Sequence, residues 1–303
     1  MFLHHNKDAF EELIVATATN LSVDSVIVEK DYYVSLALKL LNAKYPDIVF
    51  RGGTSLSKCF GLIERFSEDI DISVDASSGK MTESRKRALK SAITETIAEL
   101  GLEIFNLRET HSRRDYNRYI ARYDSMYAQV IAVKSELVIE TFVAAQPFPT
   151  LEKNVNNYIY QFLSLENQDA LAANYDLLPF KMKVQDLRRT FIDKVFALCD
   201  YYLTDDIDKH SRHIYDLYQI WGEIDFDDAF KTLVREVRAV RSSVSICPSA
   251  KDGQNVGSIL QEMIQSDCYK SDYLQITEKL LFKPVPYYKA KAVLTAIVAL
   301  HIF

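Results

Sequence analysis

The segments that decide the fold of this chain are Phe50-Arg-Gly-Gly-Thr-Ser-Leu-Ser-Lys58 and Ser67-Glu-Asp-Ile-Asp-Ile-Ser-Val74. In the first, the apolar run at residues 48–50 ends at two glycines, which predicts a strand that runs into a tight turn. Thr54 or Ser55 is placed to cap a following helix over residues 55–62. The second segment alternates polar and apolar residues, as a strand with one buried face does.

Around this centre, the first half of the chain has the pattern of helices packed on a sheet. Helices are predicted over residues 7–20, 24–44 (with Asp24 as N-cap) and 82–100, and strands near 103–109, 115–124, 127–133 and 136–143. From about residue 155 onward the periodicity is mostly helical, with helices over 186–203, 211–221, 226–241, 256–266 and 272–282 and a closing helix at 292–303. We therefore predict an α+β domain over residues 1–155 and a helical domain over residues 156–303.

The composition is that of a folded globular protein and points to no special class. The 303 residues are 48% hydrophobic and 26% charged, and 36 basic against 42 acidic residues give a net charge of −6. This balance does not indicate general nucleic-acid binding, although it leaves room for a local basic patch. The four cysteines form no C-x-x-C pair, which disfavours a zinc site and favours a cytoplasmic protein. We expect no secretory signal and no membrane span.

Asp69 and Asp71 are the first candidate site residues. Carboxylates at positions i and i+2 of a strand project from the same face, with Cα atoms about 6.5–7 Å apart. Both can then reach one magnesium ion or a pair of them. The alternative is that both lie on the solvated face of an edge strand, which is the more common situation for an isolated Asp-x-Asp.

The turn Gly52-Gly53-Thr54-Ser55 is the second candidate. Glycines allow close approach of the backbone to a ligand, and amides at a helix N-terminus suit phosphate oxygens. The alternative is an ordinary turn, because the spacing matches neither a P-loop nor a Rossmann fingerprint. Glu140 is our third carboxylate, on an apolar strand where an acid needs a partner. That partner is either a metal ion or a cation such as Lys134 or an arginine.

Together these motifs closely resemble the AbiEii/AbiGii toxin family of nucleotidyltransferases. The resemblance rests on Phe50–Lys58 and on Ile63-Glu-Arg-Phe-Ser-Glu-Asp-Ile-Asp-Ile72. It extends to Glu29-Lys-Asp-Tyr32, Lys134–Glu140, Arg189–Lys194 and Arg212–Tyr218, over roughly residues 25–220. It implies a minimal polymerase-β-like nucleotidyltransferase fold with a helical C-terminal domain, and a role in toxin–antitoxin or phage abortive-infection systems.

The resemblance also implies a role for each matched residue. Gly52, Gly53, Thr54 and Ser55 would hold the triphosphate of an NTP. Asp69, Asp71 and Glu140 would bind Mg²⁺, as one or two ions. Lys194 and Asp216 would be catalytic residues from the helical domain that complete the nucleotide pocket, and Lys58 is a second candidate cation for the phosphates. Fifteen residues separate Gly53 from Asp69, more than in minimal nucleotidyltransferases, which leaves open whether Thr54 or Ser55 contacts phosphate.

The predicted activity is transfer of a nucleoside monophosphate from an NTP to an acceptor hydroxyl, with release of pyrophosphate. By the resemblance, the acceptor is a tRNA 3′ end, the protein is a translation-blocking toxin, and its partner is a cognate antitoxin. One alternative is a transferase acting on a protein or a small molecule. Another is a non-catalytic nucleotide- or partner-binding module.

A basic stretch before and within the strand at 115–124 is interleaved with tyrosines. Its members are His111, Arg113, Arg114, Tyr116, Arg118, Tyr119, Arg122 and Tyr123. Such a combination can contact an RNA backbone and stack bases. The alternative, a solvated strand pair with packed tyrosines, is at least as well supported.

Overall fold

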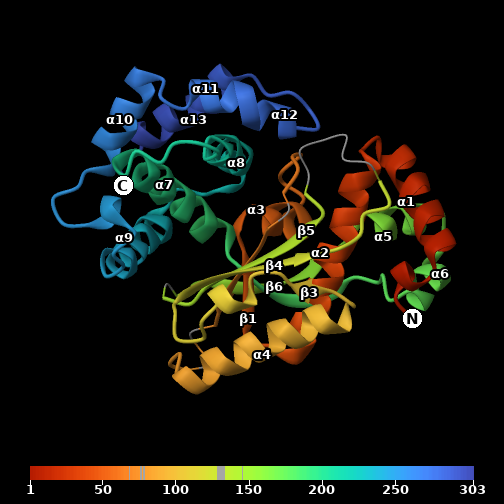
Figure 1. Ribbon diagram of the computed structural model, residues 1–303. Coiled ribbons are helices and arrows are strands. Elements are labelled where there is room, and N and C mark those ends of the chain that lie inside the picture. The colour runs from red at the N-terminus through yellow and green to blue at the C-terminus, as the bar shows by residue number, and fades with distance from the viewer. Residues whose placement is uncertain (68, 76, 78, 128–133, 145) are drawn as a thin grey trace. The chain divides into compact units, whose positions relative to one another are not determined.

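Figure 1 shows the protein as a computed structural model, which describes residues 1–67, 69–75, 77, 79–127, 134–144 and 146–303. The chain forms two compact units. Unit 1 comprises Met1–Phe60, Ser67–Val143 and Thr150–Val184, and unit 2 comprises Gly61–Phe66, Ala144–Pro149 and Gln185–Phe303. The predicted division into domains at residue 155 stays a prediction.

Unit 1 is built on a mixed sheet. In the described part of the chain the sheet has seven strands in the order β3-β4-β5-β2-β1-β7-β6. The strands are β1 (Ile48–Arg51), β2 (Asp69–Val74), β3 (Glu103–Ile104), β4 (Tyr116–Arg122), β5 (Glu136–Phe142), β6 (Thr150–Val155) and β7 (Phe180–Gln185). β2 is antiparallel to β1 and parallel to β5, and β4 is antiparallel to β5. The strands that carry the three predicted carboxylates are therefore neighbours in the middle of the sheet.

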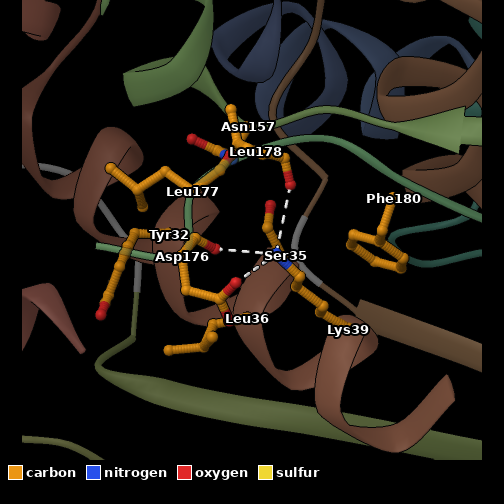
Figure 2. A pocket seen from close by; sticks show the side chains of 9 residues that line it. All are labelled: Tyr32, Ser35, Leu36, Lys39, Asn157, Asp176, Leu177, Leu178 and Phe180. Carbon is orange, nitrogen blue, oxygen red and sulfur yellow. Dashed lines mark hydrogen bonds and ion pairs between the residues drawn. The ribbon is translucent and has the colours of Figure 1, made fainter. Parts of the chain in front are cut away.

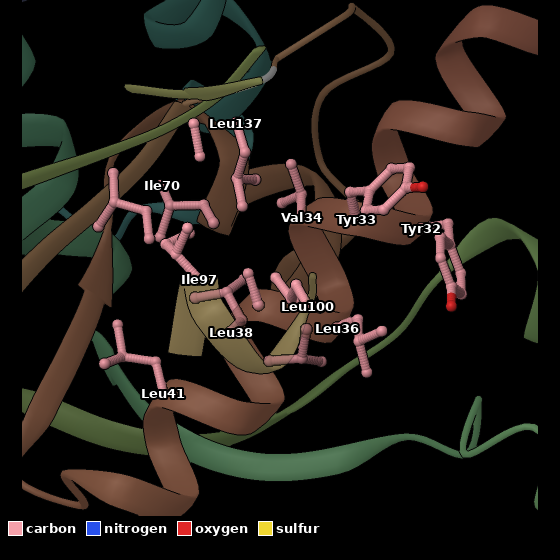
Figure 3. Packing of buried hydrophobic residues seen from close by; sticks show 14 of the residues in the cluster. Tyr32, Tyr33, Val34, Leu36, Leu38, Leu41, Ile70, Ile97, Leu100 and Leu137 are labelled. Atoms are coloured by element: carbon pink, nitrogen blue, oxygen red, sulfur yellow. The ribbon is translucent and has the colours of Figure 1, made fainter. Parts of the chain in front are cut away.

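One face of this sheet is covered by helices. The longer helices of unit 1 are α1 (Lys7–Leu21), α2 (Ser25–Lys44), α4 (Glu83–Glu99), α5 (Tyr158–Leu165) and α6 (Asp169–Asn174). Asp24 caps α2 as predicted, because its side chain accepts a hydrogen bond from the Val26 amide. Figure 3 shows apolar side chains of α2 beside Ile70 of β2 and Leu137 of β5. Burial of one such side chain stabilises the fold by about 1.5–3 kcal/mol.

This packing fixes which way the polar side chains of the sheet point. Because side chains alternate along a strand, burial of Ile70 and Ile72 sends Asp69 and Asp71 to the opposite face. In β5, burial of Ile139 under the helices sends Glu140 to that same opposite face. The burial of the apolar residues thus determines that the three carboxylates point to the same face of the sheet.

Unit 2 is helical. Its helices are α7 (Leu187–Leu203), α8 (Arg212–Ile220), α9 (Asp228–Ser242), α10 (Val256–Ser266), α11 (Lys270–Asp272), α12 (Glu278–Leu280) and α13 (Tyr287–Ala299), with the π-helical turn η7 (Tyr273–Thr277) between α11 and α12. α7 packs against α8, α9 and α10 and buries Phe191, Val195 and Phe196. The Phe66 amide donates to the Leu280 carbonyl at 2.9 Å, which fixes the segment Gly61–Phe66 within this unit.

The predicted elements are largely present, and the exceptions have physical reasons. The prediction of a mostly helical chain after residue 155 was wrong at β7, where Met182 and Val184 are buried and alternate with lysines. The run at 103–109 is a strand only at its first two residues and a 3₁₀ turn, η4 (Leu107–Glu109), at its end. The strand expected at 127–133 lies almost wholly outside the described residues.

No membrane span was predicted from the sequence. Among the described residues, none of the helices combines the length and the apolar character needed to cross a bilayer.

Candidate functional site

The turn after β1 is built around the backbone of Gly52. Gly52 has φ +77°, in the left-handed region that favours glycine. A Cβ at this position would lie 2.0 Å from Oδ2 of Asp71, far inside any allowed contact. Arg51 is the direct partner of Asp71 in the β1–β2 register, so the turn and the aspartate belong to one rung of the sheet. The sequence motifs 52–55 and 69–71 therefore form one local structure.

The helix after this turn begins earlier than predicted. It starts at Gly52, as α3 (Gly52–Ser55), and continues as the π-helical turn η2 (Leu56–Phe60). Thr54 and Ser55 are therefore inside the helix rather than caps. Both are buried: Thr54 Oγ1 lies 2.9 Å from Ser67 Oγ, and Ser55 Oγ donates to the Gly52 carbonyl at 2.8 Å. The groups of this turn suited to phosphate are the backbone amides of the first helical residues, since these have no intrahelical acceptor.

The three predicted carboxylates occupy adjacent positions on two paired strands. In the parallel pairing of β2 and β5, Asp69 lies opposite Val138 and Asp71 lies opposite Glu140. Neighbouring strands are about 4.8 Å apart, so Asp71 and Glu140 are cross-strand neighbours on one face. All three side chains are partly exposed. The structure therefore places Asp69, Asp71 and Glu140 on one face of neighbouring strands, and their role as metal ligands stays a prediction.

Glu140 is engaged by two side chains of β4. Arg118, its direct partner in the β4–β5 register, places Nε 3.1 Å from Oε1 of Glu140. Burial, together with the charge of Glu140 and a hydrogen bond to it, raises the pKa of Tyr116, which keeps the phenol protonated. The ion pair with an arginine, which sequence reasoning left open for Glu140, is thus present, whereas Lys134 uses its carbonyl to accept from Lys30 at 2.9 Å.

The donor chemistry of this face fits a hard divalent cation. Carboxylate oxygens are the ligands that magnesium prefers, and two aspartates at i and i+2 supply them from a fixed strand. As the side chains stand, the described residues contain no group of three or more His, Cys, Asp or Glu side chains arranged to hold a metal ion. The pairing of Glu140 with Arg118 is consistent with this, because it commits the third carboxylate to another cation.

Lys58 is not brought to this face. It is buried, and its Nζ lies 2.5 Å from Oδ1 of Asp31 and 2.6 Å from Oγ of Ser35, both in α2. The second carboxylate oxygen of Asp31 accepts from the Tyr158 amide at 2.8 Å. Removal of one partner from a buried ion pair of this kind strongly destabilises the folded protein. The structure therefore places Lys58 where it fastens η2 to α2, and its predicted phosphate contact stays a prediction.

Two further charged residues of α2 fasten other parts of unit 1. Glu29 accepts from the Met126 amide at 3.0 Å, and Lys30 donates to the carbonyls of Lys134 and Glu136 at the start of β5. With Asp31, these side chains tie α2 to η2, α5 and β5. The run Glu29–Tyr32 was predicted from the sequence only as part of the resemblance, without a structural role.

In unit 2, Lys194 and Asp216 are brought together with a third residue. Lys194 Nζ lies 2.6 Å from Oδ2 of Asp216, and Arg65 binds the same carboxylate through Nε at 2.7 Å and Nη2 at 2.8 Å. All three side chains are buried. Burial alone would raise the pKa of Asp216, but Arg65 and Lys194 outweigh it and hold that pKa far below its ordinary value.

Arg65 and Lys194 share this one carboxylate, and the excess of positive charge affects the pKa of Lys194. Burial lowers the pKa of Lys194, and Arg65 adds to this effect against the opposing pull of Asp216. Nδ1 of His213 lies 3.5 Å from the Lys194 ammonium, and burial together with Lys194 lowers the pKa of His213 well below its ordinary value. His213 is therefore held in its neutral form, with Nδ1 on the side of Lys194.

Arg65 is the residue that sequence reasoning missed. It lies in the Gly61–Phe66 segment between the turn and β2, 151 positions from Asp216. No spacing rule connects residues that far apart. The connection of fifteen residues between Gly53 and Asp69 is long because it includes the segment Gly61–Phe66, which belongs to unit 2.

The basic stretch divides between the two faces of the sheet. Tyr119 and Tyr123 are buried on the helix-covered face, and Tyr123 stacks on Tyr33 with ring centroids 4.3 Å apart. The alternative of packed tyrosines is thus correct for these two. Tyr116, Arg118 and Arg122 lie on the carboxylate face instead, in register with Phe142, Glu140 and Glu136.

A pocket of unit 1 is lined by residues other than the carboxylates, and one of them, Ser35, accepts from Lys58. Figure 2 shows it between α2 and the segment 176–180, where Lys39 donates to the Asp176 carboxylate at 2.7 Å. It is lined by Tyr32, Ser35, Leu36, Lys39, Asn157, Asp176, Leu177, Leu178 and Phe180. None of these is a predicted site residue.

Comparisons with known proteins identify the fold and the family of this chain. The protein is similar in structure to the nucleotidyltransferase toxin MenT4 from Mycobacterium tuberculosis, with a TM-score of 0.62 and 18% sequence identity over 95% of this chain and 88% of that one. This similarity confirms the predicted fold. A search of curated proteins finds no match. The family model described as nucleotidyl transferase AbiEii toxin, type IV toxin–antitoxin system, matches residues 39–291. Because this match covers most of its length, the chain belongs to the AbiEii nucleotidyltransferase toxin family.

Proposed function

We propose that this protein is a metal-dependent nucleotidyltransferase that moves a nucleoside monophosphate from an NTP to an acceptor hydroxyl, with pyrophosphate leaving. The observation that carries the proposal is that the Asp71 carboxylate fills the space a Cβ on Gly52 would need, on the rung where Asp71 also neighbours Glu140. A phosphate-binding turn and a set of carboxylates within one rung are what transfer of a nucleotidyl group requires. Membership of the AbiEii family supports the same activity.

In the proposed mechanism, the turn at Gly52–Ser55 binds the triphosphate through backbone amides at the start of α3. Gly52 keeps the backbone close to Asp71, so the phosphates are held beside the carboxylates. Asp69, Asp71 and Glu140 would hold Mg²⁺, which when bound stabilises the attacking and leaving oxygens of an in-line displacement. Positioning of the phosphates by fixed groups supplies a large part of the rate.

Lys194 and Asp216 remain proposed catalytic residues. Their support is the resemblance and the buried triad with Arg65, which holds both side chains in a defined geometry. By the resemblance, Lys194 would neutralise phosphate charge; in this structure its ammonium is buried and paired with Asp216. His213, neutral and close to the Lys194 ammonium, helps to orient that ammonium.

We further propose that the acceptor is a tRNA 3′ end and that the partner is a cognate antitoxin. The support is that the family consists of type IV toxins. The test is incubation of the protein with total tRNA and each of the four labelled NTPs in separate reactions. Label on tRNA with one nucleotide is the expected result. Label on protein or on a small molecule, with tRNA unlabelled, would overturn the tRNA proposal and leave nucleotidyl transfer in place.

A further inference from the structure

Arg118 occupies a position on the carboxylate face that a metal-dependent mechanism does not require. It lies opposite Glu140 in the β4–β5 register, and Glu140 lies opposite Asp71 in the β5–β2 register. One rung of the sheet therefore carries Arg118, Glu140 and Asp71 in a row. The guanidinium Nε lies 3.1 Å from Glu140, within the distance of a charged hydrogen bond.

The Arg118–Glu140 ion pair is partly exposed, so little free energy is needed to separate it. The Arg118 side chain is 46% exposed and that of Glu140 is 27% exposed. Pairs at this degree of exposure are weak, because water competes for both charges. The Arg65–Asp216 ion pair is buried, with side chains 2% and 0% exposed, and separating it would cost far more free energy. Glu140 is thus held by a cation that another cation can replace.

From this row we propose that Arg118 and a divalent metal ion compete for Glu140. This inference rests on the proposed function, since it takes Asp69, Asp71 and Glu140 to be the metal ligands. Arg118 is a positioning residue: it neutralises Glu140 and holds it beside Asp71 until a metal ion displaces the guanidinium. The released guanidinium then stays on the carboxylate face, because β4 fixes its backbone there.

The sheet offers a matched control for this proposal. Arg122 and Glu136 form the same type of pair between the same two strands, with Nε 3.3 Å from Oε1. They also lie opposite one another in the β4–β5 register, four positions along each strand from Arg118 and Glu140. Within the described residues, Glu136 has no partner aspartate in β2, because the β2–β5 register begins at Val138. Loss of Arg122 therefore removes a similar charge without freeing a proposed ligand.

The experiment measures Mn²⁺ binding to the nucleotide-free, full-length protein by titration calorimetry or by the loss of the free Mn²⁺ electron paramagnetic resonance signal. R118Q is expected to lower the Mn²⁺ Kd by about three- to tenfold, because it removes the competing guanidinium from Glu140 and a charge that repels the ion. R118K is expected to fall between R118Q and the wild type. R122Q is expected to change the Kd less than about twofold. The difference between R118Q and the wild type should shrink at high salt, since the pair is partly exposed.

The outcomes separate this inference from the proposed function. If D71N abolishes Mn²⁺ binding while R118Q binds no more tightly than the wild type, competition by Arg118 is wrong and the metal site stands. If R118Q and R122Q tighten binding equally, the effect is general charge and the inference is also wrong. If D71N binds Mn²⁺ as the wild type does, the carboxylates are not the site and both proposals fall.

Discussion

The carboxylate of Asp71 lies in the space that a side chain at position 52 would need: a Cβ on Gly52 would be 2.0 Å from Oδ2 of Asp71. This relationship explains why a glycine stands at the first position of α3. It also means that any side chain at position 52 would have to displace the proposed metal ligand.

The first prediction concerns G52A. The alanine would have to adopt φ +77° and displace Asp71, so it should lower the free energy of unfolding and abolish transfer. G101A is the control, since Gly101 has φ +73° and a Cβ added there would meet no described atom within 4 Å. We expect G101A to cost about 1–2 kcal/mol through backbone strain alone, and G52A to cost about 1–3 kcal/mol more. Urea denaturation measures both, and equal losses would contradict the account.

The second prediction compares two glutamates of β5. Glu140 and Glu136 lie on the same face, and each is paired with an arginine of β4. E140Q should reduce the transfer rate by about a hundredfold or more, because a proposed ligand next to Asp71 loses its charge. E136Q should leave the rate within about threefold of the wild type. Single-turnover transfer assays at saturating NTP give both rates, and an equal loss in both variants would exclude a special role for Glu140.

The third prediction tests the buried triad of unit 2. R65Q leaves Asp216 with only Lys194 in a buried site, which should cost about 3–5 kcal/mol of stability. R188Q is the comparison, because Arg188 pairs with Asp186 at 3.0 Å on the surface, with its side chain 41% exposed. That substitution should cost less than about 1 kcal/mol. Chemical denaturation of the two variants decides the matter, and a loss in R65Q as small as in R188Q would show that the triad is not structural.

The fourth prediction is the acid dependence of stability. The folded pKa of Asp216 is far below its ordinary value of 3.8, so its carboxylate stabilises the folded state at every pH above that value. This contribution is lost as pH falls from about 4 toward the folded pKa. The difference in unfolding free energy between the wild type and D216N should therefore shrink as pH falls below about 4. A difference that grows on acidification would have the wrong sign for this account.

The carboxylate face was predictable because it follows from local patterns. Alternation in β2 and β5 places Asp69, Asp71 and Glu140 opposite the buried isoleucines, whatever the rest of the chain does. Two glycines between an apolar run and a helix predict the turn in the same way. Each of these features depends on residues within a few positions of each other, whereas the pairing of β5 with β2, which brings Glu140 beside Asp71, joins distant residues.

The contacts that hold the site were not predictable, because they join distant residues. Arg65 meets Asp216 across 151 positions, and Lys58 meets Asp31 across 27. A lysine near a phosphate turn suggests a phosphate contact until its buried partner is known. β7 was missed for a different reason. Phe180-Lys-Met-Lys-Val184 alternates as β2 does, but the run is short and stands among segments with helical periodicity.

The central claim is nucleotidyl transfer dependent on Asp71, and the most direct measurement is transfer of label from an NTP by D71N. D115N serves as the control, since Asp115 is an exposed aspartate paired with Lys86 on the surface. We expect the wild type and D115N to transfer label to the acceptor, and D71N to transfer none while unfolding at the same denaturant concentration as the wild type. Transfer by D71N at the wild-type rate would contradict it.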